Sequence, residues 1–190
     1  MEATQHEERP VTKWDLAGIP DSIKWGFPAV LLFMTAVGVE SNFLTPHLVA
    51  GLNTSEATVS WVITGYSLTV LVASYLSGAL ADLFGPKRVM LAGAAVFIVF
   101  QFAFIFAIST GNLHLVGLTY FIRGFGFPLF AFAFLVWINH LARPSKLGTA
   151  IGWFYVMFTG GLPTLGSLVA FGVIPAFGGG FVGAVSYTHL

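Results

Sequence analysis

The sequence predicts an all-α membrane protein, and three observations support that fold class. Hydrophobic residues make up 56% of the 190-residue chain, and the mean hydropathy is +0.85. Charged residues account for only 8% of the chain, whereas they make up about 25% of a soluble domain. Apolar stretches of about 20 residues or more, each with at most one charged residue, recur along the chain, and a helix needs about this length to cross the hydrocarbon core of a bilayer.

Five membrane-spanning helices are expected, and the apolar stretches, each with at most one charged residue, define their order. Residues 1–24 are polar and lack the features of a signal peptide, so we expect them to form a cytoplasmic N-terminal tail. The spans are expected at residues 25–48, 57–81, 89–109, 115–141 and about 147–175. A glycine-rich run at 178–183 leads into a sixth span that is not completed. Residues 25–184 are therefore interpreted as a truncated transmembrane bundle.

Turn and cap residues mark the limits of the second and third spans. Thr54 or Ser55 is expected to cap the start of the second span by accepting hydrogen bonds from free backbone N–H groups. Gly85 and Pro86 are expected to reverse the chain after it, because a continuous helix does not tolerate this pair. The two spans are therefore expected to be antiparallel neighbours.

Proline and small residues predict local features within the spans. Pro128 and Pro163, each with glycines nearby, are expected to kink the fourth and fifth spans. Small residues four positions apart, at 74 and 78 and at 148 and 152, are expected to let helices approach closely.

The basic residues predict the orientation of the chain. Cytoplasmic segments of membrane proteins carry an excess of Lys and Arg. Here the tail, the link after the second span and the link after the fourth span hold seven such residues, and the other two links hold none. We therefore expect a cytoplasmic N-terminus and a multi-pass protein of the cell membrane. The seven residues are Arg9, Lys13, Lys24, Lys87, Arg88, Arg143 and Lys146.

Composition excludes several classes of function. The formal net charge is zero and no basic tract is present, so nucleic acid is not an expected partner. The absence of cysteine excludes disulfides and thiol chemistry, and the five histidines lack the spacing of a metal site. We expect no catalytic residues, metal or cofactor. The carboxylates of Glu40 and Asp82 are expected near opposite ends of the bilayer, which argues against an enzyme.

Two charged residues, Glu40 and Arg123, are expected inside the hydrocarbon region. Each lies eight or nine positions from the outer end of its span, which places both about 12 to 14 Å below the outer surface. Charge at that depth is costly and usually has a partner or faces a cavity. We expect the two side chains to neutralise each other, and a proton or solute that separates them would couple binding to a change of conformation. A purely structural ion pair is the alternative.

Uncharged polar residues in the spans are candidates for solute binding. Asn42 and Gln101 could each donate and accept hydrogen bonds to a hydroxylated solute, but each could instead bridge two helices. Trp61, Tyr66 and Tyr155 are candidates for stacking on a sugar-like face. A solute-binding role for these residues is a hypothesis at this stage.

The link between the second and third spans resembles the signature loop of the major facilitator superfamily. Leu83 and Pro86 depart from the pattern, in which basic residues are usual at these positions. The resemblance implies the N-terminal half of a fold of two six-helix bundles, with the substrate site between the halves. It also implies that Asp82 acts in the conformational switch. The residues that fit the pattern are Gly78, Leu80, Ala81, Asp82, Gly85, Lys87 and Arg88.

Longer phrases at residues 25–27, 39–46 and 123–130 resemble polyol permeases of this superfamily, such as those for ribitol or arabinitol. This similarity implies proton-driven uptake of a small sugar alcohol, with Glu40 as the residue for proton coupling. Transport of a small carboxylate, held by Arg123, is the main alternative. A membrane receptor or assembly protein is less favoured, because the expected outer links have about ten residues or fewer. The expected partners are the solute, protons, the bilayer and the missing C-terminal half.

The last six residues, 185–190, resemble the translated end of a transposon adapter used to prepare DNA libraries. We expect that they are not native sequence. A real but unusual terminus is the alternative.

Overall fold

The computed structural model describes residues 12–173, and all regular elements in that range are helices. Five helical stretches are long and apolar enough to cross a membrane, as the sequence predicted. The glycine-rich run at 178–183 and residues 185–190 lie outside the described residues. The long stretches are α2 (Gly26–Gly51), α3 (Glu56–Phe84), α4 (Pro86–Ser109), α5 with α6 (Leu113–Arg123 and Gly126–Leu141), and α7 with η3, α8 and η4 (Leu147–Thr159, Gly160–Leu165, Gly166–Leu168 and Val169–Val173).

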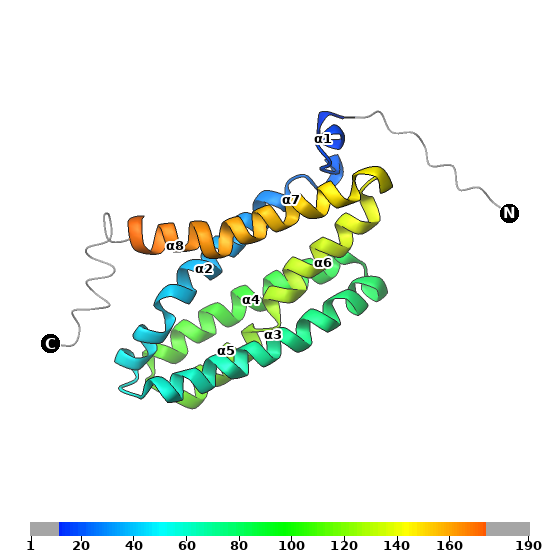
Figure 1. The fold of residues 1–190 in the computed structure, drawn as a ribbon. Coiled ribbons are helices and arrows are strands. Elements are labelled where there is room, and N and C mark those ends of the chain that lie inside the picture. The colour runs from blue at the N-terminus through cyan, green and yellow to red at the C-terminus, as the bar shows by residue number, and fades with distance from the viewer. Residues whose placement is uncertain (1–11, 174–190) are drawn as a thin grey trace.

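The helices form two packed groups (Figure 1). In one group, α2 lies along the last span, which α7, η3 and α8 form together. In the other, α4 packs along α5 and α6, and α3 contacts all three. Side chains near the middle of α2 therefore lie where the two groups meet.

The α3–α4 hairpin has the predicted turn chemistry. Ser55 caps α3, since its hydroxyl accepts a hydrogen bond from the backbone N–H of Thr58 at 3.2 Å. Gly85 ends α3 and begins α4 with φ of +85°, a conformation that residues with a Cβ rarely adopt. Pro86 follows in the first position of α4, where a missing N–H costs no helical hydrogen bond.

The fourth and fifth spans are both interrupted where proline and glycine cluster. The fourth span breaks at residues 124–125 into α5 and α6. The fifth span changes from α-helix to π-helix over η3, which contains Pro163. Pro163 has no N–H for the carbonyl of Thr159, and the hydroxyl of Thr164 donates to that carbonyl at 3.4 Å.

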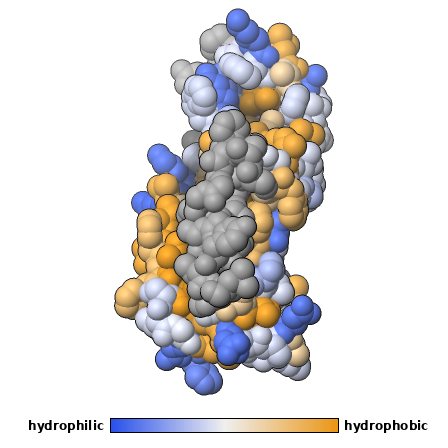
Figure 2. Space-filling view, turned by 90° about the vertical axis from the view of Figure 1, so that its left-hand side faces the viewer, coloured by the Kyte–Doolittle hydropathy of each residue, from blue (hydrophilic) through white to orange (hydrophobic). Residues whose placement is uncertain are grey.

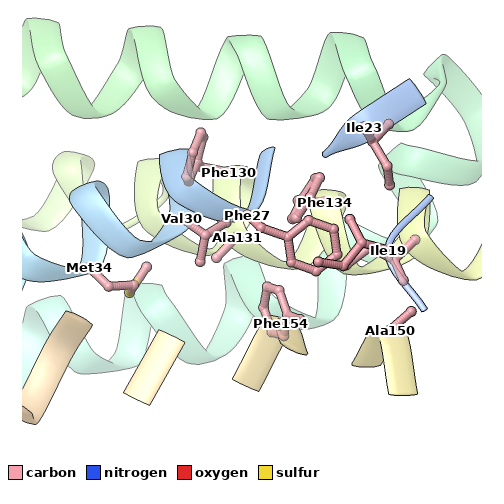
Figure 3. Packing of buried hydrophobic residues seen from close by; sticks show 11 residues of the cluster. Ile19, Ile23, Phe27, Val30, Met34, Phe130, Ala131, Phe134, Ala150 and Phe154 are labelled. Atoms are coloured by element: carbon pink, nitrogen blue, oxygen red, sulfur yellow. The ribbon is translucent and has the colours of Figure 1, made fainter. Parts of the chain in front are cut away.

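A cluster of buried aromatic and aliphatic residues joins the two groups at one end (Figure 3). The rings of Phe27 and Phe134 meet edge to face, with centroids 5.2 Å apart. Phe154 on α7 packs against Phe134 at 6.4 Å. These contacts connect α2, α6 and α7, so the end of the bundle shown in Figure 3 is held by close packing.

Part of the segment expected to be a polar tail packs onto this cluster. α1 (Lys13–Leu16) and η1 (Asp21–Ile23) precede α2, and Ile19 and Ile23 are buried in the core. The indole N–H of Trp153 donates to the carbonyl oxygen of Ala17 at 3.1 Å. The segment lacks a long apolar run, but its two isoleucines, four positions apart, both pack into the core. Residues 1–11 lie outside the described range.

Close helix contacts occur at glycines other than those predicted. A Cβ added at Gly78, Gly148 or Gly152 would meet no heavy atom within 4 Å, so the expected close approach at these positions is wrong for the described part of the chain. A Cβ added at Gly38 would instead overlap the carbonyl oxygen of Leu162. Spacing of small residues therefore indicated the possibility of close packing but not the face on which it occurs.

The exposed side chains differ between helices. Beyond the first turn of α4, where Lys87 and Arg88 are exposed, its large exposed residues are apolar, which suits contact with lipid acyl chains. On the face shown in Figure 2, hydrophilic residues lie mainly at the top and bottom of the view, and hydrophobic residues predominate between them where described residues are visible. This distribution matches a protein whose middle lies within a bilayer. The exposed residues of α4 include Leu91, Ile98, Val99, Phe102, Ile105 and Phe106.

Candidate functional site

Glu40 and Arg123 form a buried ion pair at the junction of the two helix groups. The Nη1 of Arg123 donates to Oε2 of Glu40 at 2.8 Å, and Nη2 donates to Oε1 at 2.5 Å. This two-point geometry fixes the orientation of both groups as well as neutralising their charge. The side chain of Arg123 is 1% exposed and that of Glu40 is 22% exposed. The sequence predicted the common depth, and the structure places the side chains in direct contact.

Gln101 on α4 is the third member of this cluster. Its side-chain oxygen accepts a hydrogen bond from Nη1 of Arg123. The same nitrogen therefore binds both Gln101 and Glu40. The sequence left open whether Gln101 binds solute or bridges helices, and in this conformation it connects α4 to α5.

Four aromatic rings surround the guanidinium group, and we call them the aromatic box. The Cζ of Arg123 lies 4.6 Å from the ring centroid of Tyr120, 4.8 Å from Phe97, 5.3 Å from Phe104 and 5.6 Å from Tyr66. Ring faces attract cations, most strongly where water is excluded. The Nε of Arg123 has no hydrogen-bond partner within residues 12–173 and is buried among these groups.

The local sequence explains how the box forms. Tyr120 lies one helical turn before Arg123 on α5, so both project from the same face. Tyr120 stacks on Tyr66 of α3 at 4.3 Å and contacts Phe104 of α4 at 4.9 Å. A Cβ at Gly124 would come within 3.0 Å of Thr69, so this glycine lets α5 end close against α3.

Asn42 lies near the pair in sequence but makes other contacts. Its amide nitrogen donates to the carbonyl oxygen of Gly38 at 2.7 Å and lies 3.4 Å from the hydroxyl of Ser167. Asn42 therefore connects α2 to α8 in this conformation. The contacts that the structure describes do not join it to Glu40 or Arg123.

The signature-loop residues lie in the α3–α4 hairpin, away from the ion pair along α3. Asp82, Lys87 and Arg88 are exposed, and Gly78 has open space beside it. Within residues 12–173, no ion pair or side-chain hydrogen bond involves these charged residues. The structure thus brings together Glu40, Arg123 and Gln101 but leaves the charges of the hairpin open to solvent.

Sequence reasoning missed most of the aromatic box. Tyr66 was singled out for stacking on a solute, but Phe97, Phe104 and Tyr120 were not singled out among the many aromatic residues. The available signal was positional, because Tyr120 precedes Arg123 by one helical turn and Phe97 and Phe104 flank Gln101 on α4. No group of three His, Asp or Glu residues in the described range could hold a metal ion.

A groove of about 490 Å³ lies between α3 and α5, and its lining does not include the ion pair. Trp61, Gly65 and His114 are among its lining residues. The pair is therefore separate from this opening in the described conformation.

Five membrane-length helices around a buried ion pair define a multi-pass helical membrane protein. The chain belongs to the major facilitator superfamily, whose family model matches residues 26–187. The resemblance of the hairpin to the superfamily loop is thereby confirmed at the level of the family.

Named relatives divide between two kinds of solute. The chain is 38% identical over 163 residues to an alpha-ketoglutarate permease of Bacillus subtilis, covering 85% of this chain and 37% of that protein. It is 32% identical over 188 residues to a D-arabinitol transporter of Klebsiella pneumoniae, covering 91% of this chain and 44% of the relative. A ribitol transporter of the same organism is 32% identical over 187 residues, covering 90% of this chain and 44% of the relative.

The chain spans about two fifths of the length of these curated relatives. No solved structure matches it significantly.

Proposed function

We propose that this chain is part of a secondary active transporter that takes up a small polyol by alternating access, driven by protons. The Glu40–Arg123 pair is the proposed coupling element. The observation that carries this proposal is the burial of a two-point ion pair where the two helix groups meet. Homologues named as transporters support the general class of function.

The coupling follows from the cost of burying charge. Arg123 and Glu40 are tolerated together because each neutralises the other, and removing one charge leaves the other poorly compensated. A proton on Glu40 would weaken its hold on Arg123 and release α2 from α5. Proton binding would thereby change the packing between the two helix groups.

Similarity to the D-arabinitol and ribitol transporters favours a polyol as solute. Gln101 and Tyr66 lie beside Arg123 and carry groups that hydrogen-bond hydroxyls. A small carboxylate is the second candidate, because the guanidinium fork matches a carboxylate and one relative is named as an alpha-ketoglutarate permease.

Uptake by the full-length protein that contains this chain tests the proposal. Vesicles would be supplied with labelled arabinitol, ribitol or alpha-ketoglutarate, with and without a proton gradient. We expect polyol uptake that depends on the proton gradient. Glu40→Gln should make uptake independent of the gradient, whereas the control Ser41→Ala, at an exposed neighbouring position, should leave uptake unchanged. Uptake of alpha-ketoglutarate alone would transfer the proposal to the carboxylate. Uptake indifferent to both the gradient and Glu40→Gln would refute proton coupling.

We also propose that the N-terminus faces the cytoplasm of a cell membrane and that Asp82 acts in the conformational switch. The chain has no cysteine, so a single cysteine at exposed Ser145 in the α6–α7 link would report its side of the membrane. A cytoplasmic link is protected from an impermeant maleimide in intact cells. Labelling from outside would reverse the proposed orientation.

The described bundle is expected to need the remainder of a longer protein to transport solute. The chain covers about two fifths of its relatives, and superfamily sites lie between two halves. Residues 1–184 alone should therefore show no uptake above empty vesicles. Measurable uptake by this segment would contradict the expectation.

A further inference from the structure

We propose that Arg123 is the stationary member of the ion pair, that Glu40 is the mobile member, and that Gln101 is a positioning residue that keeps the guanidinium in place when Glu40 moves away. This inference rests on the proposed function, because it concerns how the same pair opens. It assigns different roles to two residues that a simple ion-pair description treats alike.

The surroundings of the two side chains are unequal. Arg123 is 1% exposed and contacts the aromatic box as well as Gln101 and Glu40. Glu40 is 22% exposed, and in the described part of the chain its side chain hydrogen-bonds only to Arg123. If the pair opens, Arg123 keeps most of its contacts, whereas Glu40 has no other described protein partner to hold it.

Gln101 can retain Arg123 because its amide does not titrate. Glu40 and Gln101 share Nη1 of Arg123, and only Glu40 bonds Nη2. When Glu40 accepts a proton, the amide oxygen of Gln101 remains an acceptor for Nη1. The aromatic box continues to attract the cation. Tyr66 and Tyr120 are the other titratable groups that face the pair from packed elements, and both belong to this box.

The charge balance of the step is simple. One proton from the medium converts the Glu40 carboxylate to a neutral carboxylic acid, and Arg123 stays protonated. The net charge of the pair changes from zero to +1. Nη2 then becomes available to a solute oxygen, while Nη1 stays on Gln101. Gln101 should consequently matter most when Glu40 carries its proton.

The pH profile of uptake by the full-length transporter tests the role of Gln101. We expect Gln101→Leu to lower uptake about tenfold where Glu40 is protonated, which is the effect of losing one hydrogen bond to a charged group, and to change it little where Glu40 is ionised. Gln101→Asn should partly restore the acidic limb. The control Asn139→Leu, at an exposed polar position of α6, should leave the profile unchanged. An equal loss by Gln101→Leu at every pH would overturn the positioning role.

Distance measurements test the stationary and mobile assignments without relying on transport. Cysteines for spin labels would be placed at exposed Ser41 on α2, Leu118 on α5 and Val99 on α4. Glu40→Gln should broaden the 41–118 distance distribution and leave the 99–118 distribution unchanged. Adding Gln101→Leu should then broaden the 99–118 distribution. If Glu40→Gln broadens both distributions equally, or broadens neither, the proposal is wrong even if uptake is proton-coupled.

Discussion

The Glu40–Arg123 pair and the α3–α4 hairpin both carry charge, but their surroundings differ. Arg123 is enclosed by the aromatic box, Gln101 and Glu40, so its geometry is defined by contacts from α2, α3, α4 and α5. Asp82, Lys87 and Arg88 are exposed on the hairpin, and no described residue forms an ion pair with them. The described residues therefore make many close contacts with Arg123 and form no ion pair with the charges of the hairpin.

This difference in burial predicts that the two sites affect the stability of the bundle to different extents. Charges that are buried and paired affect the free energy of unfolding strongly when a partner is lost. Exposed charges affect it little. If the hairpin acts in a conformational switch, its charges should affect transport without affecting the stability of this bundle.

The largest expected effect is at Arg123. Arg123→Ala should lower the free energy of unfolding by about 3 to 5 kcal/mol, because it leaves Glu40 partly buried without its partner. Arg88→Ala on the hairpin should change it by less than about 0.5 kcal/mol. Equilibrium unfolding in detergent would measure both. Similar losses for the two variants would contradict the distinction between the sites.

A double-mutant cycle sharpens this result. Combining Glu40→Gln with Arg123→Gln should cost less than the sum of the two single changes, because the second change removes the unpaired charge that the first creates. Additive losses would show that the pair contributes no coupling energy.

The second effect compares identical changes at two glycines. Gly38→Ala should destabilise the bundle by about 1 to 3 kcal/mol, since its methyl group would overlap Leu162 on η3. Gly78→Ala should leave stability unchanged or raise it by up to about 1 kcal/mol, because alanine favours the helix and the space beside Gly78 is open. Thermal unfolding of both variants would measure the difference. A loss at Gly78 as large as that at Gly38 would reject the described packing.

The third effect should appear in transport alone. In the full-length transporter, Asp82→Asn should reduce uptake about tenfold, within the usual range of coupling energies, while unfolding changes by less than about 0.5 kcal/mol. Glu56→Gln, at the exposed opposite end of α3, serves as the matched control and should change neither. Normal uptake by Asp82→Asn would remove the hairpin from the proposed switch.

The smallest effect concerns Asp15, a partly buried carboxylate in the first turn of α1 that differs from Asp82 in having local hydrogen-bond partners. The backbone N–H of Thr12 donates to Asp15 at 3.1 Å and the Thr12 hydroxyl at 2.9 Å, and these bonds lower the pKa of Asp15. A lowered pKa in the folded state means that the contribution to stability is present at neutral pH and is lost as the carboxylate becomes protonated in acid. Thermal unfolding from about pH 6 to about pH 3 should therefore be less pH-dependent for Asp15→Asn than for the unmodified chain. An equal pH dependence of unfolding for Asp15→Asn and the unmodified chain would contradict this expectation.

Much of the fold could be predicted because each span is a local property of the sequence. Long apolar stretches with at most one charge predicted the five spans. Ser55 caps α3 and Gly85 forms the turn after it, as expected. The common depth of Glu40 and Arg123 also followed from counting residues along the helices. The rotation of each helix was harder to predict, because nearly every side of these spans is apolar.

That uncertainty about rotation accounts for the features that were missed. Phe97 belongs to the aromatic box and Phe102 is exposed, yet the two are five positions apart on α4 in a stretch that is apolar except for Gln101. Gly38 on α2 packs against η3. Gly148 lies on the span that contains η3, but it faces open space. Which aromatic residue or glycine makes a contact depends on the neighbouring helix, and the sequence of one helix does not contain that information.

The π-helix at η3 has a consequence for how this chain can vary. Its wider turn accommodates one more residue than an α-helix, as the hydrogen bond from the N–H of Gly166 to the carbonyl of Gly161 shows. Deleting one residue between Gly161 and Gly166 would close this wide turn to an α-helical one, because the bonded residues would then be four positions apart. Gly166 would keep its place against Gly38. The same deletion within α7 would instead rotate everything after it by about 100°. A single-codon deletion should therefore be tolerated better in η3 than in α7.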